Sequence, residues 1–420
     1  MLDLDRWTEI WATITRNKTR SLLTCLGVFW GILMLVLLLG AGKGLRNGIM
    51  GNFQGFATNS VFIWSDRTSM PFRGFTKGRS WSIRNRDYEA IRKEVKGIEA
   101  ISSMLGADSP AKNIVYGQVS GSFNVKGVMP SYFQIESPEV LYGRLLNDLD
   151  ERERRKVCLL GERVNRTLFK GADPCGKYVR VNGLYYQVAG VIKTRSQSVS
   201  INGRTDEAVL LPFNTMQEAM NLGDIVFLLG ISVRQGYPVQ RVIDDVSALL
   251  KRQNSIAPAD PQAVGYVNLA AQFALIEKLF LGIDFLVWLV GMGTLLAGVI
   301  GISNIMMVTV AERTRELGIR RALGAKPFNI VSQVVEESLL LTALAGFLGL
   351  SLGVFLLDFI NRLLTTHTAG GDLSFFTNPG VSLGTALTAA AIILLAGFVA
   401  GLIPAWRAMQ IKAIDAIREE

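Results

Sequence analysis

Residues 312–325 read ERTRELGIRRALGA, and this charged stretch follows directly on a long uncharged one. No ionisable side chain occurs between Phe285 and Ala311, whereas six of the next fourteen residues are charged. An arginine or lysine at the centre of a bilayer costs roughly 2.5 to 3.5 kcal/mol on insertion scales. The boundary at Glu312 therefore predicts the end of a membrane span, with a charged helix joined to it.

Uncharged windows long enough to span a bilayer, about 20 residues, occur four times in this chain. They are Ser21–Gly42, Phe285–Ala311, Ser338–Leu357 and, within Leu373–Trp406, a stretch near Leu383–Pro404. We therefore predict a membrane protein with four transmembrane α-helices, one before and three after a large extracytoplasmic mixed α/β domain. The predicted segments are 1–20 (cytoplasmic amphipathic helix), 21–42 (first span), 43–278 (extracytoplasmic domain, two subdomains), 279–311 (second span), 312–332 (cytoplasmic coupling segment), 333–360 (third span), 361–382 (short outer loop), 383–404 (fourth span) and 405–420 (cytoplasmic tail).

Basic residues flank the predicted spans on one side. They are Arg6, Arg16, Lys18 and Arg20, then Arg313, Arg315, Arg320, Arg321 and Lys326, then Arg407, Lys412 and Arg418. Because cytoplasmic loops carry an excess of lysine and arginine, we expect a multi-pass protein of the cytoplasmic (inner) membrane with both termini in the cytoplasm. The connector at 361–381 carries only Arg362, which suits the outer side.

The N-terminal segment allows two interpretations. Its apolar run is too long and starts too late for a cleavable signal peptide, so the first span is expected to remain as an anchor. Leu4, Trp7, Trp11 and Ile14 predict an amphipathic helix on the cytoplasmic membrane surface. The alternative is a simple extension of the first span.

The exported segment predicts alternating strands and helices. Residues 177–192 alternate around Asn182–Gly183, a strong signal for a two-residue hairpin because both positions tolerate positive φ. Apolar residues at helical spacing predict helices near 88–98, 215–220 and 238–253, with strands at 208–211 and 227–233. Residues 65–82 show no period and predict a surface loop, which we expect to influence the choice of substrate.

Charge and cysteine content leave alternatives open. The chain has 49% hydrophobic residues, a mean hydropathy of +0.30 and a net charge of +9. The segment Lys43–Lys278 holds 31 basic and 22 acidic residues, so the excess lies in the exported part. Nucleic acid is not an expected partner, because no reading motif accompanies the charge; anionic headgroups, an acidic partner or solubility alone would each explain it. Cys158 and Cys175 either pair or remain structural thiols.

The sequence offers few residues that could form a catalytic or metal-binding site. GADPCGK at 171–177 has the spacing of a phosphate loop, but Tyr178 stands where serine or threonine should bind magnesium. His367 is the only histidine, which disfavours a Ser-His-Asp triad or a histidine-rich metal site. We predict no catalytic residue, no metal ligand and no cofactor in this chain.

Glycine pairs in the predicted spans favour close helix packing, within a protomer or between two. Small residues let helices approach where lipid supplies no hydrophobic drive, although glycine is common in membrane helices in any case. The candidate packing positions are Gly27, Gly31, Gly298, Gly301, Gly349, Gly353, Gly397 and Gly401.

At this point the chain closely resembles the permease subunits of the MacB-like and FtsX-like branch of ABC transporters. The matching stretches, in the family's order, are NKTRSLLTCLG (17–27), GVMPSYF (127–133), GADPCGKYVRVNGLYYQVAGVI (171–192), ERTRELGIRRALGA (312–325) and IPAWRAMQIKAIDAIR (403–418). The resemblance implies four spans in a 1+3 arrangement, a non-catalytic subunit, and transmission of ATP-driven motion to the exported domain for export or extraction of a substrate.

The same resemblance implies partners and coupling residues. A separate ABC ATPase subunit would bind ATP and magnesium, a second permease protomer would complete a homodimer or related heterodimer, and a periplasmic adaptor and outer-membrane channel are further candidates. The residues expected to couple to the ATPase are Glu312, Arg313, Arg315, Glu316, Gly318, Arg320, Arg321 and Gly324. Members with a fused ATPase differ, because no complete phosphate loop occurs here.

Two other classes of function compete with a permease. A membrane-anchored extracytoplasmic binding or sensor protein would explain the domain and topology, but would leave 312–325 without a role. An exported hydrolase is disfavoured because the exported segment has no histidine to form a nucleophile–histidine constellation. A stoichiometric nucleotide-binding partner would distinguish the first alternative from a transporter subunit.

Overall fold

The computed structural model describes residues 18–51, 53–106, 113–195, 202–367, 379–380 and 383–410. Most of the predicted N-terminal helix, most of the outer loop and the end of the tail lie outside these residues. The chain divides into two compact units, one formed by residues up to Ile49 and from Lys278 onward, the other by Met50–Glu277.

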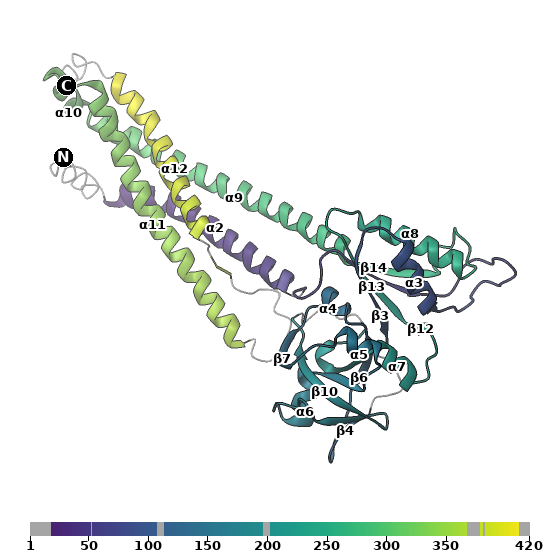
Figure 1. The fold of residues 1–420 in the computed structure, drawn as a ribbon. Helices are drawn as coiled ribbons and strands as arrows, with labels where there is room; N and C mark the ends of the chain where they lie inside the picture. Colours follow the sequence, from purple (N-terminus) through teal and green to yellow (C-terminus); the bar gives the residue numbers. More distant parts are fainter. Residues whose placement is uncertain are drawn as a thin grey trace. The chain divides into compact units, whose positions relative to one another are not determined.

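Four helices in the described part of the chain are long and apolar enough to cross a membrane. They are α2 (Lys18–Gly51), α9 (Leu269–Glu312), α11 (Pro327–His367) and α12 (Leu383–Gln410), with the short helix α10 (Thr314–Ala322) between α9 and α11 (Figure 1). A helix satisfies its own backbone hydrogen bonds, which a lipid interior requires. One helix before and three after a mixed α/β domain confirm the predicted fold class.

Three of these helices, α2, α9 and α11, extend well beyond the windows predicted from composition. Helix α9 contains 44 residues and begins at Leu269, ten residues before the predicted segment at 279. Helix α2 ends at Gly51, past the predicted boundary at 42. Hydropathy indicates only which part of a helix lipid can surround. Backbone hydrogen bonding continues into polar sequence, so each of these helices is longer than its membrane-spanning part.

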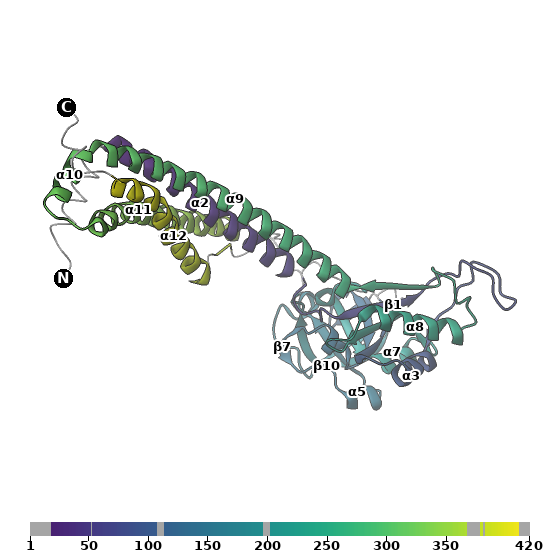
Figure 2. The same cartoon turned by 90° about the horizontal axis from the view of Figure 1, so that it is seen from above.

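Small residues lie where the bundle helices meet. Helix α2 runs beside α9 (Figure 2), and Gly27 faces Gly298 so closely that an added Cβ would stand 3.4 Å from the Gly298 Cα. On α11, a Cβ at Gly349 would lie 2.7 Å from the Phe29 carbonyl oxygen of α2. On α12, Gly397 and Gly401 face Thr342 and Ser338 of α11, whose side chains are buried.

One predicted packing position differs from the others. A Cβ at Gly301 would meet nothing within 4 Å, in contrast to Gly31, Gly298 and Gly353. Contacts inside this protomer therefore give no reason for the absence of a side chain at Gly301. The role of that glycine between two protomers stays a prediction.

The second unit is built on a mixed sheet. Its strands are β1 (Ser60–Ser65), β2 (Ile83–Arg84), β3 (Ile98–Leu105), β4 (Asn113–Tyr116), β5 (Val119–Ser122), β6 (Asn124–Val128), β7 (Glu139–Gly143), β8 (Val157–Gly161), β9 (Tyr178–Val181), β10 (Leu184–Lys193), β11 (Ala208–Pro212), β12 (Ile225–Val226), β13 (Leu228–Val233) and β14 (Val264–Asn268). Its helices are α3 (Asn85–Glu94), α4 (Tyr132–Ile135), α5 (Asp148–Arg152), α6 (Glu162–Phe169), α7 (Phe213–Ala219) and α8 (Val239–Gln253), with a 3₁₀ turn at Thr205–Glu207.

One path of hydrogen-bonded strands crosses this unit in the order β14-β1-β13-β3-β6-β11-β8-β10-β9-β4-β5, with β7 beside β10. Strand β6 runs parallel to β11, and β8 runs parallel to β10, while the other pairs on the path are antiparallel. The link from β3 to β6 has only two residue pairs, Met104 with Val128 and Leu105 with Gly127. The β11–β8 and β9–β4 links also have two residue pairs each, so strand pairing is short at three places along the sheet.

The elements predicted from periodicity are present in this unit, except that the helix predicted near 88–98 ends at Glu94 (α3) and Ile98 instead begins strand β3. Strands β9 and β10 form the expected hairpin, and its two turn residues, Asn182 and Gly183, both have positive φ (48° and 86°). Helix α8 buries Val242, Val246 and Leu250 in one core cluster with strands β1 and β13. Cys158 and Cys175 are free thiols, so the structure takes the unpaired alternative.

Candidate functional site

The charged segment at 312–332 folds as a short helix between two breaks. Helix α9 ends at Glu312, and Arg313 leaves helical geometry with φ −101° and ψ 10° before α10 begins at Thr314. Hydrogen bonds continue through the break, because Arg313 N donates to the Thr309 carbonyl (3.2 Å) and Leu317 N donates to the Arg313 carbonyl (3.0 Å). The chain thus changes direction while its backbone stays hydrogen bonded.

The end of α10 is fixed by glycine. Gly324 has φ +94° and donates from N to the Arg321 carbonyl (3.1 Å), while Ala325 N donates to the Arg320 carbonyl (3.1 Å). These two bonds form a Schellman motif, which satisfies carbonyls that would otherwise end the helix unpaired. Pro327 then opens α11, where a missing N–H has no cost. Local sequence therefore fixes the C-terminal end of α10.

The inner side of α10 is anchored in the bundle core. Leu317 is 8% exposed and belongs to one apolar cluster with Met306 and Val310 of α9 and Ile330 and Val334 of α11. Gly318 is also buried. Burial of apolar side chains contributes about 25 cal/mol per Å², so the helix is held by packing as well as by chain connectivity.

Three arginines of the segment face inward and bind neighbouring helices. The Arg313 guanidinium lies 3.8 Å from the Glu337 carboxylate of α11, whose side chain is 8% exposed. Arg320 Nη1 donates to Gln333 Oε1 of α11 (3.0 Å), and Arg321 Nη1 donates to the Met409 carbonyl near the end of α12 (2.7 Å). Helix α10 is therefore tied by polar contacts to both α11 and α12.

The outer side of the segment presents charge and apolar surface together. Glu312, Arg315 and Glu316 are exposed, and they are followed by Leu323 at 83% and Phe328 at 75% exposure. Charged residues suit solvent, but two large apolar side chains exposed this fully at a helix junction are typical of a surface that binds another protein.

The structure therefore divides the predicted coupling residues into two groups. Glu312, Arg315 and Glu316 point outward, whereas Arg313, Gly318, Arg320 and Arg321 lie partly or fully inside, and Gly324 forms the turn. Four further residues belong to the site although the sequence pattern did not indicate them: Glu337, Gln333, Leu323 and Phe328. Glu337 directly precedes the third uncharged window, and this position was the available signal for a buried partner of Arg313.

Two models of known protein families match this chain. The MacB-like periplasmic core domain matches residues 21–249, and the FtsX-like permease C-terminal region matches residues 288–413. The first match covers more than half of the chain, and the second includes the whole charged segment.

Curated proteins of the same kind align over almost the full chain. It is 27% identical over 410 residues to a macrolide export ATP-binding/permease protein, MacB, of Bdellovibrio bacteriovorus, covering 97% of this chain and 60% of that protein. It is 28% identical over 419 residues to a probable syringafactin export ATP-binding/permease protein, SyfD, of Pseudomonas syringae, covering 98% and 59%. The chain thus spans about 60% of the length of these relatives.

Solved structures of exported domains also align with part of the chain. The periplasmic region of MacB from Actinobacillus actinomycetemcomitans is 20% identical with a TM-score of 0.43, covering 54% of this chain and 96% of that one. The extracellular domain of the noncanonic ABC-type transporter YknZ from Gram-positive bacteria is 16% identical with a TM-score of 0.41, covering 50% and 100%.

Proposed function

The chain belongs to the permease family with a MacB-like periplasmic core domain and an FtsX-like C-terminal region, and from this premise we propose that it is the transmembrane subunit of an ABC transporter. In this proposal a separate ATPase subunit hydrolyses ATP and docks on the cytoplasmic segment at 312–332. A second permease protomer completes the bundle. The resulting motion reaches the extracytoplasmic domain and drives export or extraction of a substrate.

The two-sided character of α10 is the observation that carries this proposal. Its outer side offers Arg315, Glu316 and the exposed Leu323 to a protein surface. Its inner side is tied through Arg320 to α11 and through Arg321 to α12. A force applied from outside therefore meets a helix that cannot shift without displacing these bonds, as a two-state mechanical switch requires.

The exported domain supports the second half of the proposal through its connectivity. Helices α2 and α9 both contain the residues at which the two units divide, near Ile49 and Lys278. A rearrangement of the bundle can therefore be transmitted along continuous hydrogen-bonded backbone. A periplasmic adaptor and an outer-membrane channel are further proposed partners, suggested by relatives named as exporters.

Docking is tested by the outward residues. We expect the full chain, purified from membranes of its own cells, to carry a stoichiometric nucleotide-binding subunit. Leu323→Asp together with Phe328→Asp should reduce that association at least about tenfold, because buried charge replaces apolar contact at the interface. Tyr185→Asp, at an exposed position in the exported domain, is the matched control and should retain the partner.

Transmission is tested separately by the inward residues. Arg320→Glu with Arg321→Glu should leave the ATPase bound but abolish stimulation of ATP turnover by substrate, because the contacts with Gln333 and Met409 are lost. Retained coupling in this variant would contradict the proposed route. Repeated absence of any nucleotide-binding partner would instead favour a membrane-anchored sensor, the alternative that explains the domain but leaves the exposed surface of α10 without a role.

A further inference from the structure

The segment between β1 and β2, residues 66–82, is a hairpin with a defined tip. Phe72 N donates to the Phe75 carbonyl (3.1 Å), and Phe75 N donates to the Phe72 carbonyl (3.0 Å). The two residues between them, Arg73 and Gly74, both have positive φ (48° and 84°). Asparagine or glycine normally takes the first of these turn positions. An arginine held there is strained, and such strain is a reason to look for function.

A buried carboxylate holds this hairpin in place. Asp260, which is 0% exposed, accepts hydrogen bonds from Ser69 N (2.8 Å), Ser69 Oγ (2.7 Å) and Met70 N (3.1 Å) across the hairpin. It also accepts from Gln262 N (3.0 Å) and Ala263 N (3.2 Å) in its own loop. Five donors compensate the cost of burying the charge, so the base of the hairpin is positioned firmly.

The far strand of the hairpin is fixed as well. Arg79 Nη2 donates to the Asn254 carbonyl (2.6 Å) just after α8, and Trp81 Nε1 donates to the Ala263 carbonyl (3.0 Å). The Arg79 guanidinium also stands 4.0 Å from the centre of the Phe75 ring. The hairpin is thus hydrogen bonded to the C-terminal end of α8 and to the loop that follows this helix.

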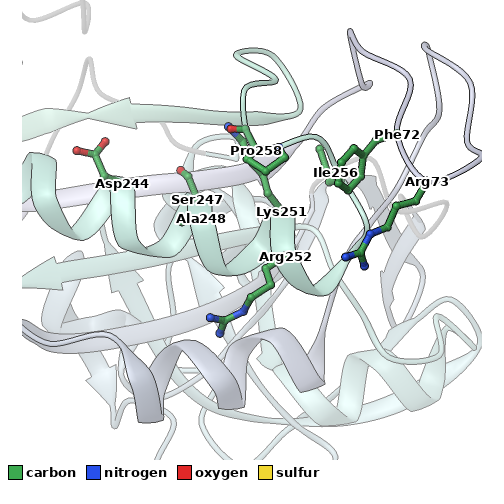
Figure 3. A pocket seen from close by; sticks show the side chains of 9 residues that line it. All are labelled: Phe72, Arg73, Asp244, Ser247, Ala248, Lys251, Arg252, Ile256 and Pro258. Carbon is green, nitrogen blue, oxygen red and sulfur yellow. The ribbon is translucent and has the colours of Figure 1, made fainter.

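A cavity of about 340 Å³ lies between the hairpin tip and α8. Figure 3 shows Phe72 and Arg73 entering it from the hairpin, while α8 supplies Asp244, Ala248 and Lys251 on one face at helical spacing. The loop after α8 adds the buried Ile256 and the exposed Pro258. The lining is therefore apolar in its middle and charged at its ends.

The charge in the cavity is positive and largely uncompensated. Among the described residues, the Lys251 ammonium donates to the Pro258 carbonyl (3.1 Å), a neutral partner, and Arg73 makes a cation–π contact with Phe72 (5.5 Å). No ion pair to either cation occurs in this described part. Arg252 differs, because its guanidinium is paired with Glu94 (2.6 Å). Two cations in the cavity are thus available to an anion.

We propose that this cavity is a binding site for a small amphipathic carboxylate. Arg73 and Lys251 are the cations of the lining that can donate charge-assisted hydrogen bonds to the carboxylate. Phe72, Ile256 and Ala248 offer apolar contact to its body, and Asp244 lies at the other end of the lining on α8. The acid at that end disfavours a second anionic group, so the site selects monocarboxylates over dianions.

A purely structural explanation covers only part of this arrangement. Cations at the C-terminal end of a helix interact favourably with its dipole, and this accounts for Lys251 and Arg252 on α8. The helix dipole does not account for Arg73, which lies outside the helix in a strained turn. It also does not account for the five hydrogen bonds to Asp260 that fix the position of the hairpin. These two features are what a preformed ligand site requires.

The test uses 2-naphthoate with the full chain in lipid nanodiscs, measured by equilibrium dialysis against empty nanodiscs. We expect saturable binding of naphthoate, and binding of the neutral 2-naphthamide at least about tenfold weaker. Arg73→Gln and Lys251→Gln should each weaken naphthoate about five- to tenfold. Lys251→Arg should retain it.

Two variants serve as matched controls. Lys77→Gln removes a charge from the same hairpin outside the cavity and should change binding less than about twofold, because exposed charges are screened. Asp244→Asn should leave binding unchanged or tighten it. Equal binding of naphthoate and naphthamide, unaltered binding in Arg73→Gln and Lys251→Gln, or no saturable binding at millimolar naphthoate would each overturn the proposal. The measurement needs no ATPase, so its outcome is independent of the coupling proposal.

Discussion

At the scale of single residues, Lys126 is an unusual side chain. It lies on β6 with 1% of its surface exposed, and its ammonium donates to the Gly203 carbonyl and to Thr205 Oγ1 (3.3 Å). Burial lowers the pKa of Lys126 to about 8, although the nearby carboxylates of Glu136 and Asp206 raise it. The charged form of this lysine is therefore less stable in the fold than in the unfolded chain.

Because the pKa of Lys126 is lowered in the fold, the free energy of unfolding should increase as the pH rises. Between about pH 8 and pH 10.4 the unfolded chain binds the Lys126 proton more strongly than the folded chain, so stability rises with pH in that window. Raising the pH from 7.5 to 9.5 should contribute about 2 kcal/mol through this residue. Lys126→Met should lack that contribution.

The measurement is the difference between the wild type and Lys126→Met in thermal unfolding at the two pH values. Other groups, such as Cys158, whose pKa burial raises, titrate in both proteins and cancel in that difference. An identical pH response in the two proteins would contradict the pKa assigned to Lys126.

A residue's role could be predicted from the sequence when it depends on neighbouring positions, but not when it depends on residues far away in the chain. The Asn182–Gly183 turn was predictable because φ preference is a property of the residues themselves. Lys126 was not, because β6 is buried on both faces, and the alternation that marks an exposed strand residue is absent there. Glu337 was missed because its partner Arg313 lies 24 positions earlier, across the break that separates α9 from α10.

At the scale of elements, glycine sets the approach of the bundle helices. A Cβ at Gly349 would lie 2.7 Å from a backbone carbonyl of α2, which cannot rotate away as a side chain can. We therefore expect Gly349→Ala to destabilise the bundle by about 1 to 3 kcal/mol, the usual cost of overpacking. The change would appear as a lower thermal unfolding midpoint in nanodiscs.

Gly301→Ala is the matched control for this prediction. An added methyl group at that position meets nothing within 4 Å, so the helix-forming preference of alanine should leave stability equal or slightly higher. If Gly301→Ala instead weakened association between protomers, Gly301 would pack against the second protomer and not within its own bundle. Equal destabilisation by both substitutions would contradict the contact geometry.

The ion pair between Arg313 and Glu337 makes a further prediction at this scale. Removing one partner takes away the opposite charge that lies 3.8 Å from the other, partly buried charge, so Arg313→Gln and Glu337→Gln should each lower the thermal midpoint. The double variant should be more stable than either single variant. A strictly additive loss would show that the two side chains do not interact.

Helix bounds show what composition alone can and cannot predict. The four apolar windows predicted the existence and order of α2, α9, α11 and α12, because exclusion of charge from lipid is a strong and local constraint. Their lengths were not predictable in this way, since α9 continues through Glu277, Lys278 and Asp284 without interruption. Hydrogen bonding and neighbouring helices set those ends, and neither is visible in hydropathy.

At the scale of the whole molecule, the proposed orientation can be tested directly. In a chain with Cys25, Cys158 and Cys175 replaced by serine, Tyr185→Cys should react with a membrane-impermeant maleimide added outside the cytoplasmic membrane. Phe328→Cys should react only after that membrane is opened. Both side chains are exposed, so accessibility within the fold does not limit either reaction. Labelling of Phe328→Cys from outside would contradict the assigned topology and the docking site with it.

The order of strands has a consequence for biosynthesis. The first strand, β1, pairs with β13 and β14, which the ribosome makes more than 160 residues later. Its apolar sequence SVFIWS must therefore wait beyond the translocation channel with both edges unsatisfied until the rest has crossed. Since β14 ends at Asn268 and α9 begins at Leu269, the strand that completes this edge of the sheet is synthesised immediately before the second membrane helix.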